Sequence, residues 1–301
     1  MSFDTIGILT PGDMGHVVGQ VLQTHGLRVL TCLKGRSALT RSLAQKADIG
    51  DVPTYEDLVR DTDLILSIVV PEQALNIARL VAEATRKVGK TTIYVDCNAI
   101  APSTMKAIDE VIRATGSRCI DVGIIGSPPR QSGRTRFYAS GPEVELFAEV
   151  ANFGLDVRTL GREIGQASGL KMCYAALTKG TTALATELLT AAHTMGLYQP
   201  LIEEFQLSQE GRYQTMERQL PVMPTKAYRW ISEMEEIAKT FADVGLTPKI
   251  LQGVADMYRF VSTTSLGEER PENRDKNRTL AQMIETLAAD LQAKKAAPPL
   301  P

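Results

Sequence analysis

Few residues of this chain belong to the types that build metal centres or redox sites. The cysteines stand far apart, at Cys32, Cys97, Cys119 and Cys173. No two of them form a C-x-x-C pair, so we expect buried, reduced thiols. The histidines are equally scattered, at His16, His25 and His193. They lack the spacing of metal ligands, and we expect no metal.

A dominant charge and a long apolar run are also missing. The formal net charge is −2, so no basic face favours nucleic acid as a partner. No apolar stretch approaches the roughly 20 residues that span a bilayer; even the segment 176–197 contains Lys179 and Glu187. The N-terminus has no signal-peptide pattern. We therefore expect a cytoplasmic protein that binds neither nucleic acid nor membrane.

The first half of the 301 residues alternates strand and helix patterns. Strand-like runs lie at 5–9, 28–33, 64–70, 92–96 and 118–122, with further candidates at 137–140 and 157–160. Helical patterns separate them at 14–25, 38–46, 72–86 and 103–115. The run 64–70 is apolar on both faces, as in the buried strands of a parallel sheet. This alternation predicts an α/β fold with a Rossmann-type doubly wound sheet.

From residue 165 onward the strand patterns stop. Apolar side chains recur at helical spacing at Leu177, Leu184, Leu188, Ala191 and Met195. Further helical patterns lie at 201–210, 225–244, 248–264 and 274–293. We expect a nucleotide-binding domain at 1–163, an all-helical domain at 164–293 that serves substrate binding and dimerisation, and a disordered tail at 294–301.

The turn after the first strand is the most informative segment. It consists of Thr10, Pro11, Gly12, Asp13, Met14 and Gly15. Its N–H groups and the following helix dipole would face a pyrophosphate. Gly12 would allow close approach of that group, and Gly15 would allow the helix to pack on its strand. Thr10 stands where the first glycine of G-x-G-x-x-G belongs, and an ordinary turn with two glycines is the alternative.

The end of the second strand indicates the type of cofactor. Sites that prefer NAD place an acid there, about 20 residues after the glycine turn, to hold the ribose hydroxyls. Residues 33–37 contain no acid. Lys34, Arg36 and Ser37 would instead bind a 2′-phosphate through charge-assisted hydrogen bonds. The sequence therefore favours NADP, with NAD as the alternative.

Four segments occur in a distinctive order. They are 12–15, Val69-Val70-Pro71, 96–102 and 165–171. Their order and spacing resemble the G-x-M-G turn, cofactor groove, D-x-S-T-x-x-P and G-x-G-x-x-x-K segments of the β-hydroxyacid dehydrogenase superfamily, which includes 3-hydroxyisobutyrate and 6-phosphogluconate dehydrogenases. The resemblance implies that Val69, Val70 and Pro71 line the cofactor groove and that Lys171 is the catalytic lysine. It also implies a homodimer.

The chain departs from that family's pattern at several positions. Tyr174 and Ala175 stand where the family has two asparagines after its lysine, and residues 121–127 differ from D-A-P-V-S-G-G. Ser232 and Glu233 replace a Lys-Asp pair. The resemblance is therefore to a subgroup whose C-terminal half is a domain of unknown function.

Lys171 is the candidate general acid or base that exchanges a proton with the substrate oxygen; the alternative is a solvated surface lysine. At about 100° per residue, Thr178 shares its helical face and is a candidate substrate contact. Lys179 flanks that face, and we expect it to be an exposed charge.

Three further positions are candidates for substrate or cofactor contacts. Asn98 follows the fourth strand and would hydrogen-bond the nicotinamide carboxamide or a substrate hydroxyl, or else shape the turn before Pro102. Gly126 and Ser127 would present N–H groups to a carboxylate, or form a simple turn. Arg229 would clamp an anionic substrate beside Trp230, or else be solvated next to core aromatics.

These patterns favour an NADP-dependent oxidoreductase that moves hydride between nicotinamide and a small, anionic hydroxy or keto acid, in the cleft between the domains. Imine reduction is a second hypothesis, because altered polar groups beside the lysine accompany altered substrates. A nucleotide-binding regulator without turnover is a third.

Overall fold

The computed structural model describes residues 3–131, 133–270 and 273–296. The chain divides into two compact units, Met1–Cys173 and Tyr174–Pro301. The division falls within the long helix α7 (Gln166–Thr194), which begins the predicted helical domain.

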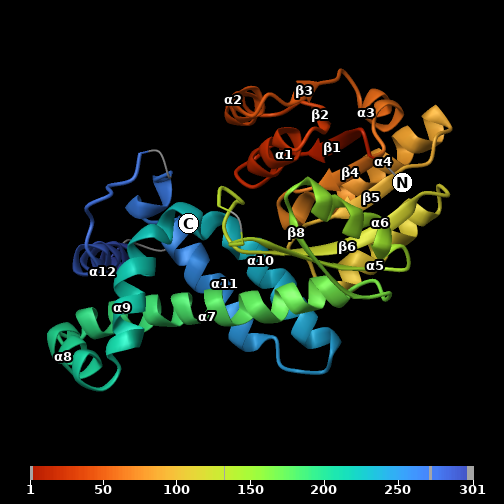
Figure 1. The fold of residues 1–301 in the computed structure, drawn as a ribbon. Helices are drawn as coiled ribbons and strands as arrows, with labels where there is room; N and C mark the ends of the chain where they lie inside the picture. The colour runs from red at the N-terminus through yellow and green to blue at the C-terminus, as the bar shows by residue number, and fades with distance from the viewer. Residues whose placement is uncertain (1–2, 132, 271–272, 297–301) are drawn as a thin grey trace. The chain divides into compact units, whose positions relative to one another are not determined.

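The first unit is built on an eight-stranded sheet (Figure 1). Its strands are β1 (Thr5–Leu9), β2 (Arg28–Thr31), β3 (Gly50–Asp51), β4 (Leu64–Ser67), β5 (Ile93–Asp96), β6 (Arg118–Ile125), β7 (Arg136–Ser140) and β8 (Asp156–Gly161). The strand order is β3-β2-β1-β4-β5-β6-β7-β8, and all neighbours are parallel except β6 and β7. The order reverses direction between β1 and β4, which confirms the doubly wound fold.

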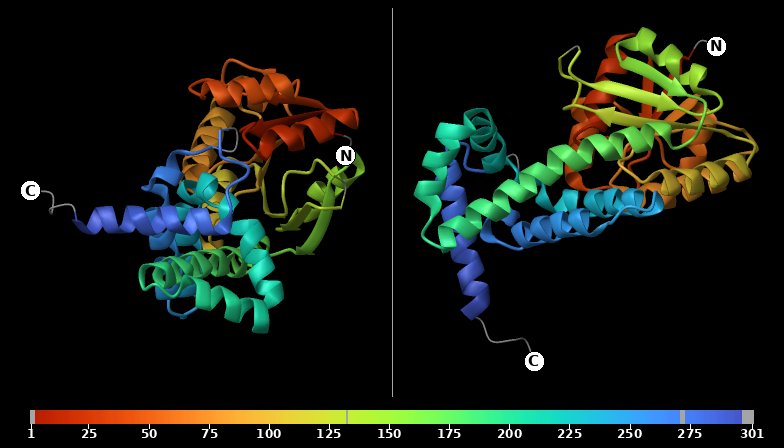
Figure 2. Two further views of the ribbon diagram at one scale, coloured as in Figure 1. Left: turned by 90° about the vertical axis from the view of Figure 1, so that its left-hand side faces the viewer. Right: turned by 90° about the horizontal axis from the view of Figure 1, so that it is seen from below.

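Helices cover both faces of this sheet (Figure 2). They are α1 (Gly15–Thr24), α2 (Ala38–Lys46), α3 (Tyr55–Asp61), η1 (Pro71–Gln73), α4 (Ala74–Val88), α5 (Pro102–Arg113), α6 (Val144–Ala148) and η2 (Glu149–Phe153). One core packs α1, α2 and α6 on strand residues such as Ile8, and the other packs α3, α4 and α5 on residues such as Ile65. Because both faces are buried at the centre of the sheet, β1 and β4 consist mostly of buried apolar residues.

The second unit is helical, as predicted. It contains the rest of α7 and α8 (Tyr198–Ser208), α9 (Glu210–Gln219), η3 (Leu220–Val222), α10 (Pro224–Asp243), α11 (Lys249–Ser262), η4 (Ser265–Glu268) and α12 (Leu280–Ala296). Helices α10 and α11 pack side by side. Residues 294–296 of the predicted disordered tail are the last residues of α12, and 297–301 lie outside the described residues.

Short elements escaped the sequence patterns. Helix α3 spans seven residues and β3 two, which is too few to establish a period. Strand β4 ends at Ser67 rather than at residue 70. The regular pairing stops there, because the backbone of Ile68 bonds both Leu9, the last residue of β1, and Thr10, the residue after it.

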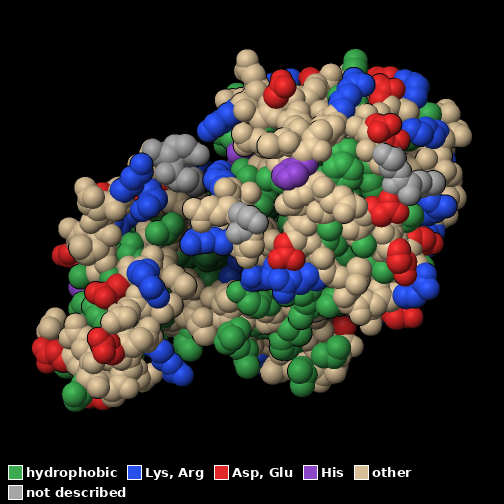
Figure 3. Space-filling model, viewed as in Figure 1, with side chains coloured by type: hydrophobic (Ala, Val, Ile, Leu, Met, Phe, Trp, Pro, Cys, Tyr) green, Lys and Arg blue, Asp and Glu red, His purple; other side chains and the backbone are tan. Residues whose placement is uncertain are grey.

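The apolar residues at helical spacing on α7 are largely exposed in the single chain. Leu177 is 70% exposed and Leu184 58%, and Met195, directly after the end of α7, is 65% exposed. Figure 3 shows hydrophobic side chains at the surface along α7. Buried threonines occupy another face of the helix, at Thr182, Thr186 and Thr190. Each hydroxyl donates to the carbonyl four residues earlier, so its burial leaves no unsatisfied group.

Two further predictions concern cysteines and membranes. Cys32, Cys97 and Cys119 are buried, but Cys173 is exposed, so the expectation of four buried thiols is wrong at that position. Within the described residues, no helix has the length and apolarity required to cross a bilayer.

Helix α1 begins in close contact with the turn that precedes it. A Cβ atom added to Gly15 would lie 2.1 Å from the carbonyl oxygen of Thr10. At Gly12 no described atom lies within 4 Å of such a Cβ. Gly15 is thus required by packing, whereas Gly12 leaves open space in front of the turn.

We expect Gly15→Ala to lower the free energy of unfolding by about 1–3 kcal/mol, because backbone must move to accept the methyl group. Gly12→Ala is the matched control and should leave stability unchanged. Urea denaturation of both variants measures the difference. Equal stability of the two variants would contradict the close contact.

Candidate functional site

The four sequence motifs meet at the carboxyl ends of the parallel strands. The N–H of Thr10, two residues before the first motif, donates to the carbonyl of Ile68, 3.1 Å away, which directly precedes the second motif. The N–H of Val69 donates to Oδ1 of Asn98 in the third motif at 2.6 Å. These contacts join the ends of β1, β4 and β5 at the place where a doubly wound sheet binds its ligand.

The third and fourth motifs touch through Pro102, the first residue of α5. A Cβ atom on Gly165 would lie 3.1 Å from the Pro102 side chain, and one on Gly169 would lie 3.6 Å from it. Gly165 also has a φ of +101°, which favours glycine. The four segments therefore form one chain of contacts along the edge of the first unit.

The glycine turn contacts His16, for which the sequence predicted no role in the turn. The Nδ1 atom of His16 lies 2.6 Å from the carbonyl oxygen of Gly12, and the ring is buried. Pro11 is also buried, Thr10 and Met14 are half-buried, and Asp13 is exposed. Gly12 is half-buried and its N–H donates to the carbonyl of Thr10 at 2.8 Å, so contact between the turn and a pyrophosphate stays a prediction.

The end of β2 combines the predicted basic residues with an unpredicted acid. Lys34 is exposed, and the Ser37 hydroxyl caps α2 by accepting from the N–H of Thr40. Asp51 of β3 accepts a hydrogen bond of 2.8 Å from the N–H of Leu33. The sequence did not predict this carboxylate, because it lies outside residues 33–37 and reaches the end of β2 only through the pairing of β2 with β3.

Arg36 is half-buried, and its Nη2 donates to the hydroxyl of Tyr55 at 3.1 Å. Its Nε is buried and has no hydrogen-bond partner among the described residues. A buried guanidinium N–H without an acceptor is costly, so the position fits an anionic ligand group.

Asn98 is buried, and its side chain makes hydrogen bonds within the protein. Its Nδ2 donates to Asp96 Oδ2 at 2.8 Å and to Ser67 Oγ at 3.1 Å, while Oδ1 accepts from Val69. Both side-chain N–H donors are used, so the carboxamide ties the ends of β4 and β5 together. This arrangement agrees with the turn-shaping alternative, and contact with a ligand stays a prediction.

Two buried carboxyl groups, Asp96 and Asp121, occupy paired positions on β5 and β6. Burial raises the pKa of Asp96 to about 7, although hydrogen bonds from Asn98 act in the opposite direction. Burial likewise raises the pKa of Asp121, against the hydrogen bonds that it accepts. Each acid begins a segment that was compared with the family, 96–102 or 121–127, but the sequence predicted no role for either carboxyl group.

Asp121 holds the start of α7. Its Oδ2 accepts from the N–H groups of Gly165 (2.9 Å) and Ser168 (3.0 Å), and its Oδ1 accepts from the Ser168 hydroxyl at 2.6 Å. Ser140 links the two elements, because its hydroxyl donates to Asp121 and accepts from the N–H of Ala167. A carboxylate at a helix N-terminus also interacts favourably with the helix dipole.

Lys171 lies about one turn beyond these contacts, directly over β6. A Cβ atom on Gly123 would lie 2.6 Å from the carbonyl oxygen of Ala167 and 3.0 Å from Cβ of Lys171. The lysine is half-buried. Its position therefore depends on the contact between α7 and the glycine of β6.

Gly126 and Ser127 follow the same strand. Both are exposed, and Gly126 has a φ of +124° with the carbonyl of Arg134 close behind it. The carbonyl of Ser127 accepts a short hydrogen bond from the Thr135 hydroxyl. In the second motif, Val69 and Pro71 are half-buried and Val70 is 41% exposed.

Residues of the second unit differ more from expectation. The prediction of an exposed Lys179 is wrong, because its ammonium pairs with the carboxylate of Glu233 and the two side chains are only 13% and 11% exposed. The same ammonium lies 5.3 Å from the ring centroid of Trp230. Thr178 lies at the surface and lines a cavity with Lys179 and Trp230.

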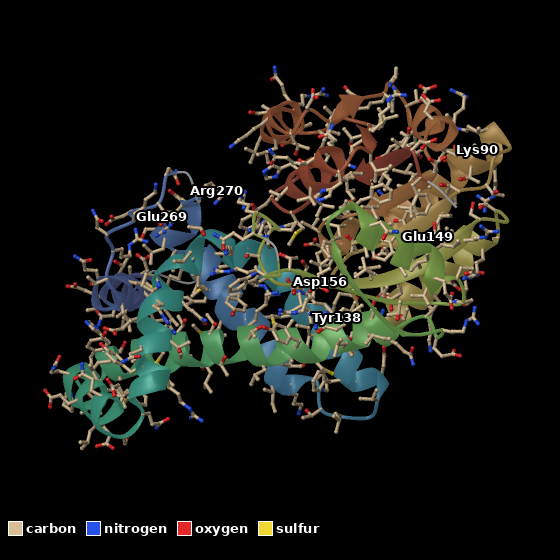
Figure 4. The ribbon with its side chains drawn as sticks, viewed as in Figure 1. Lys90, Tyr138, Glu149, Asp156, Glu269 and Arg270 are labelled. Atoms are coloured by element: carbon tan, nitrogen blue, oxygen red, sulfur yellow. The ribbon has the colours of Figure 1, made fainter. Side chains whose placement is uncertain are left out.

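Arg229 stacks near an aromatic ring. Its guanidinium lies 5.9 Å from the ring centroid of Tyr228, and that of Arg270 lies 5.0 Å from the same centroid. Figure 4 labels Arg270 and its neighbour Glu269, which pairs with Arg278. A substrate contact of Arg229 stays a prediction.

Ala175 is buried and Tyr174 is 48% exposed. The part of the chain that the structure describes contains no group of three or more His, Cys, Asp or Glu residues that could hold a metal ion.

Comparison with known families agrees with this geometry. Residues 5–153 match the NAD binding domain of 6-phosphogluconate dehydrogenase, and residues 192–261 match a domain of unknown function, DUF1932. An uncharacterized 28.5 kDa protein of Methanothermus fervidus is 28% identical over 263 residues, which are 85% of this chain and 98% of that protein. The mitochondrial 3-hydroxyisobutyrate dehydrogenase of Drosophila melanogaster is 26% identical over 195 residues, 64% of this chain and 57% of that enzyme.

Solved structures show the same fold. A conserved protein of unknown function, described as structurally similar to 3-hydroxyacid dehydrogenases, has a TM-score of 0.64 and 29% identity over 85% of this chain and 97% of its own. An imine reductase of Streptomyces aurantiacus has a TM-score of 0.54 and 15% identity, with 94% and 99% covered, which shows the fold alone.

The fold, the glycine turn and these matches define a protein of the oxidoreductase class that binds a nicotinamide cofactor. The chain belongs to the β-hydroxyacid dehydrogenase-like superfamily and carries a C-terminal DUF1932 domain.

The buried carboxyl group of Asp96 makes stability depend on pH. A carboxyl group whose pKa rises from 3.8 in the unfolded chain to about 7 in the fold binds its proton more tightly when folded. Its contribution to the free energy of unfolding therefore falls as pH rises between these values. Asp96→Asn should flatten this slope, as measured by urea denaturation at several pH values between 4 and 7.

The exposed acid Asp13 provides the matched control, because Asp13→Asn should retain the slope of the parent protein. The slope is informative even where Asp96→Asn lowers stability as a whole. Identical slopes for the parent and Asp96→Asn would contradict the assignment.

Proposed function

We propose that this protein is an NADP-dependent oxidoreductase in which Lys171 acts as the general acid or base. The observation that carries the proposal is the position of Lys171 on α7. Asp121 bonds the start of this helix and Gly123 lets it pack closely on β6, in the unit that matches the NAD binding domain. The substrate is a small hydroxy acid or its keto form.

The nicotinamide supplies or accepts the hydride at the reacting carbon. In reduction, Nζ of Lys171 gives a proton to the substrate oxygen and so completes the alcohol. In oxidation, the neutral amine takes that proton back. Positioned general acids or bases contribute about 10²- to 10⁴-fold to such rates.

The preference for NADP is supported by the basic residues after β2. Arg36 has a buried Nε without an acceptor among the described residues, and the exposed Lys34 adds positive charge. Asp51, the acid on β3, already accepts a hydrogen bond from Leu33. NAD is the alternative, favoured by that same carboxylate if it turns to ribose hydroxyls instead.

Gly126 and Ser127 are the proposed anchors for the substrate carboxylate, because they are exposed directly after β6, the strand against which α7 packs at Lys171. Thr178 and Arg229 remain candidate contacts from the second unit. Asn98 contributes by shaping the edge of the sheet.

Two other functions have specific support. Imine reduction is favoured by the replacement of the family's asparagine by the buried Ala175, and an imine reductase shares the fold. A nucleotide-binding regulator is favoured by Thr10 in place of glycine, which alters the turn without abolishing it.

A cytoplasmic homodimer is the proposed form of the protein. The exposed apolar side chains of Leu177 and Leu184 on α7, and of Met195 directly after it, support association, because isolated chains rarely expose rows of large apolar groups.

Removal of the amine tests the chemistry. Lys171→Met should lower NADPH-dependent turnover of keto acids by about 10²-fold or more, while the dissociation constant for NADPH stays unchanged. Stopped-flow or steady-state absorbance follows turnover, and calorimetry follows binding.

Lys106→Met, at an exposed lysine of α5, is the control and should retain activity. Full activity of Lys171→Met would overturn the role of the amine. Tight binding of NADPH by the parent protein, without turnover of any keto acid or imine, would favour the regulator.

The choice between the two cofactors depends on the basic residues after β2. Arg36→Ala should raise the Michaelis constant for NADPH far more than that for NADH, because only NADPH carries the 2′-phosphate. Loss of one charge-assisted hydrogen bond should raise the Michaelis constant for NADPH by about 10-fold or more. Equal effects on the two cofactors would refute the preference for NADP.

A further inference from the structure

The guanidinium of Arg36 is held by a neutral partner. Its Nη2 donates to the phenolic hydroxyl of Tyr55 at 3.1 Å, and Tyr55 is the first residue of α3. Among residues 3–131, 133–270 and 273–296, this is the only hydrogen bond of the Arg36 side chain, and no carboxylate pairs with it. The contact therefore joins the segment after β2 to the start of α3 without an ion pair.

The ring of Tyr55 is anchored in the protein. The residue is half-buried, and its ring packs against the core that contains Leu30 and Val52. Thr54 caps α3 by accepting the N–H of Asp57, so the backbone beside the ring is held as well. A ring that is fixed in this way restricts the positions of the guanidinium that its hydroxyl binds.

The acids next to this contact have other partners. Glu56 and Asp57 follow the tyrosine and form ion pairs with Lys87 and Arg60, respectively. Asp51, at the end of β3, accepts a hydrogen bond from a backbone N–H that follows β2. The positive charge of the guanidinium is therefore not cancelled by a carboxylate of the described chain.

This arrangement orients an arginine and preserves its charge. A guanidinium has five N–H donors in a rigid fork, and the phenol occupies one of them. A carboxylate in the same place would neutralise the group and compete for the same fork. A neutral acceptor is thus the partner that suits an arginine which has to bind a phosphate.

We propose that Tyr55 is a positioning residue for cofactor selection. Its hydroxyl holds the guanidinium of Arg36 where the adenosine 2′-phosphate of NADP binds, and it leaves the positive charge available to that phosphate. Tyr55 acts through Arg36. This role presupposes the proposed preference for NADP.

Two adenosine ligands test the 2′-phosphate without turnover. Calorimetry on the full-length protein compares adenosine 2′,5′-bisphosphate with adenosine 5′-monophosphate, and the parent protein should bind the bisphosphate more tightly. Tyr55→Phe keeps the ring and removes the hydroxyl. It should weaken the bisphosphate by about 5-fold or more and leave the monophosphate unchanged.

Tyr138→Phe is the matched control. Tyr138, labelled in Figure 4, is also a half-buried tyrosine whose ring lies near an arginine, 5.9 Å from the guanidinium of Arg158. It belongs to β7, in the other half of the sheet. This variant should bind both ligands as the parent protein does.

A double-mutant cycle separates positioning from a merely structural effect. In the Arg36→Ala background, Tyr55→Phe should cause no further loss of the bisphosphate, because the group that it positions is gone. Tyr55→Glu places a charged acceptor beside Arg36. It should weaken the bisphosphate at least as much as Tyr55→Phe does, because it neutralises the guanidinium.

The role of Tyr55 would be overturned by an unchanged affinity of Tyr55→Phe or Tyr55→Glu for the bisphosphate, by an equal loss of both ligands in Tyr55→Phe, or by the same loss with and without Arg36. An equal loss in Tyr138→Phe would also overturn it. A parent protein that binds both ligands equally would overturn the preference for NADP and this role together. Discrimination by the parent that Tyr55→Phe fully retains overturns this role alone.

Discussion

The buried carboxylate of Asp121 is the interaction on which the geometry of the first unit depends. It sits in the middle of β6 and accepts hydrogen bonds from the backbone and side chain at the start of α7. An ion removed from water is costly unless its acceptors are filled. Gly165, Ser168 and Ser140 fill them, and the start of α7 cannot shift without breaking several bonds at once. Because Gly123 also lets the helix lie directly on the strand, the position of Lys171 follows from these two features of one strand.

A second polar connection operates at the same edge of the sheet. Asp96 and Asn98 bond one another, and Asn98 reaches across to Ser67 and Val69 at the end of β4. The carboxyl edge of the sheet, where the glycine turn also lies, therefore contains buried polar groups whose hydrogen bonds are made within the protein. Asn98, a candidate ligand contact in the sequence, holds the backbone at the ends of β4 and β5. The proposed nucleotide contacts then fall mainly to the start of α1 after the glycine turn and to the basic residues after β2.

The second unit follows a different plan. Its long helix buries threonines and exposes leucines, because a threonine hydroxyl can bond its own helix and so be buried without loss. The ion pair of Lys179 and Glu233 beside Trp230 gives this unit a polar centre of its own. Buried ion pairs are weak evidence for stability, since desolvation offsets their attraction.

Local patterns were enough to predict the alternation of strands and helices, the glycine turn, the helical second half and the order of the four motifs. Each of these depends on residues a few positions apart, and the period of apolar side chains records them directly. Contacts between distant segments were decided only by the tertiary structure: Asp51 beside Leu33, Asp121 at the start of α7, and Lys179 paired with Glu233 rather than exposed. Which side of α7 faces solvent was likewise decided only by the tertiary structure. The physical reason is that burial and ion pairing are properties of the packed neighbourhood, which no window of sequence contains.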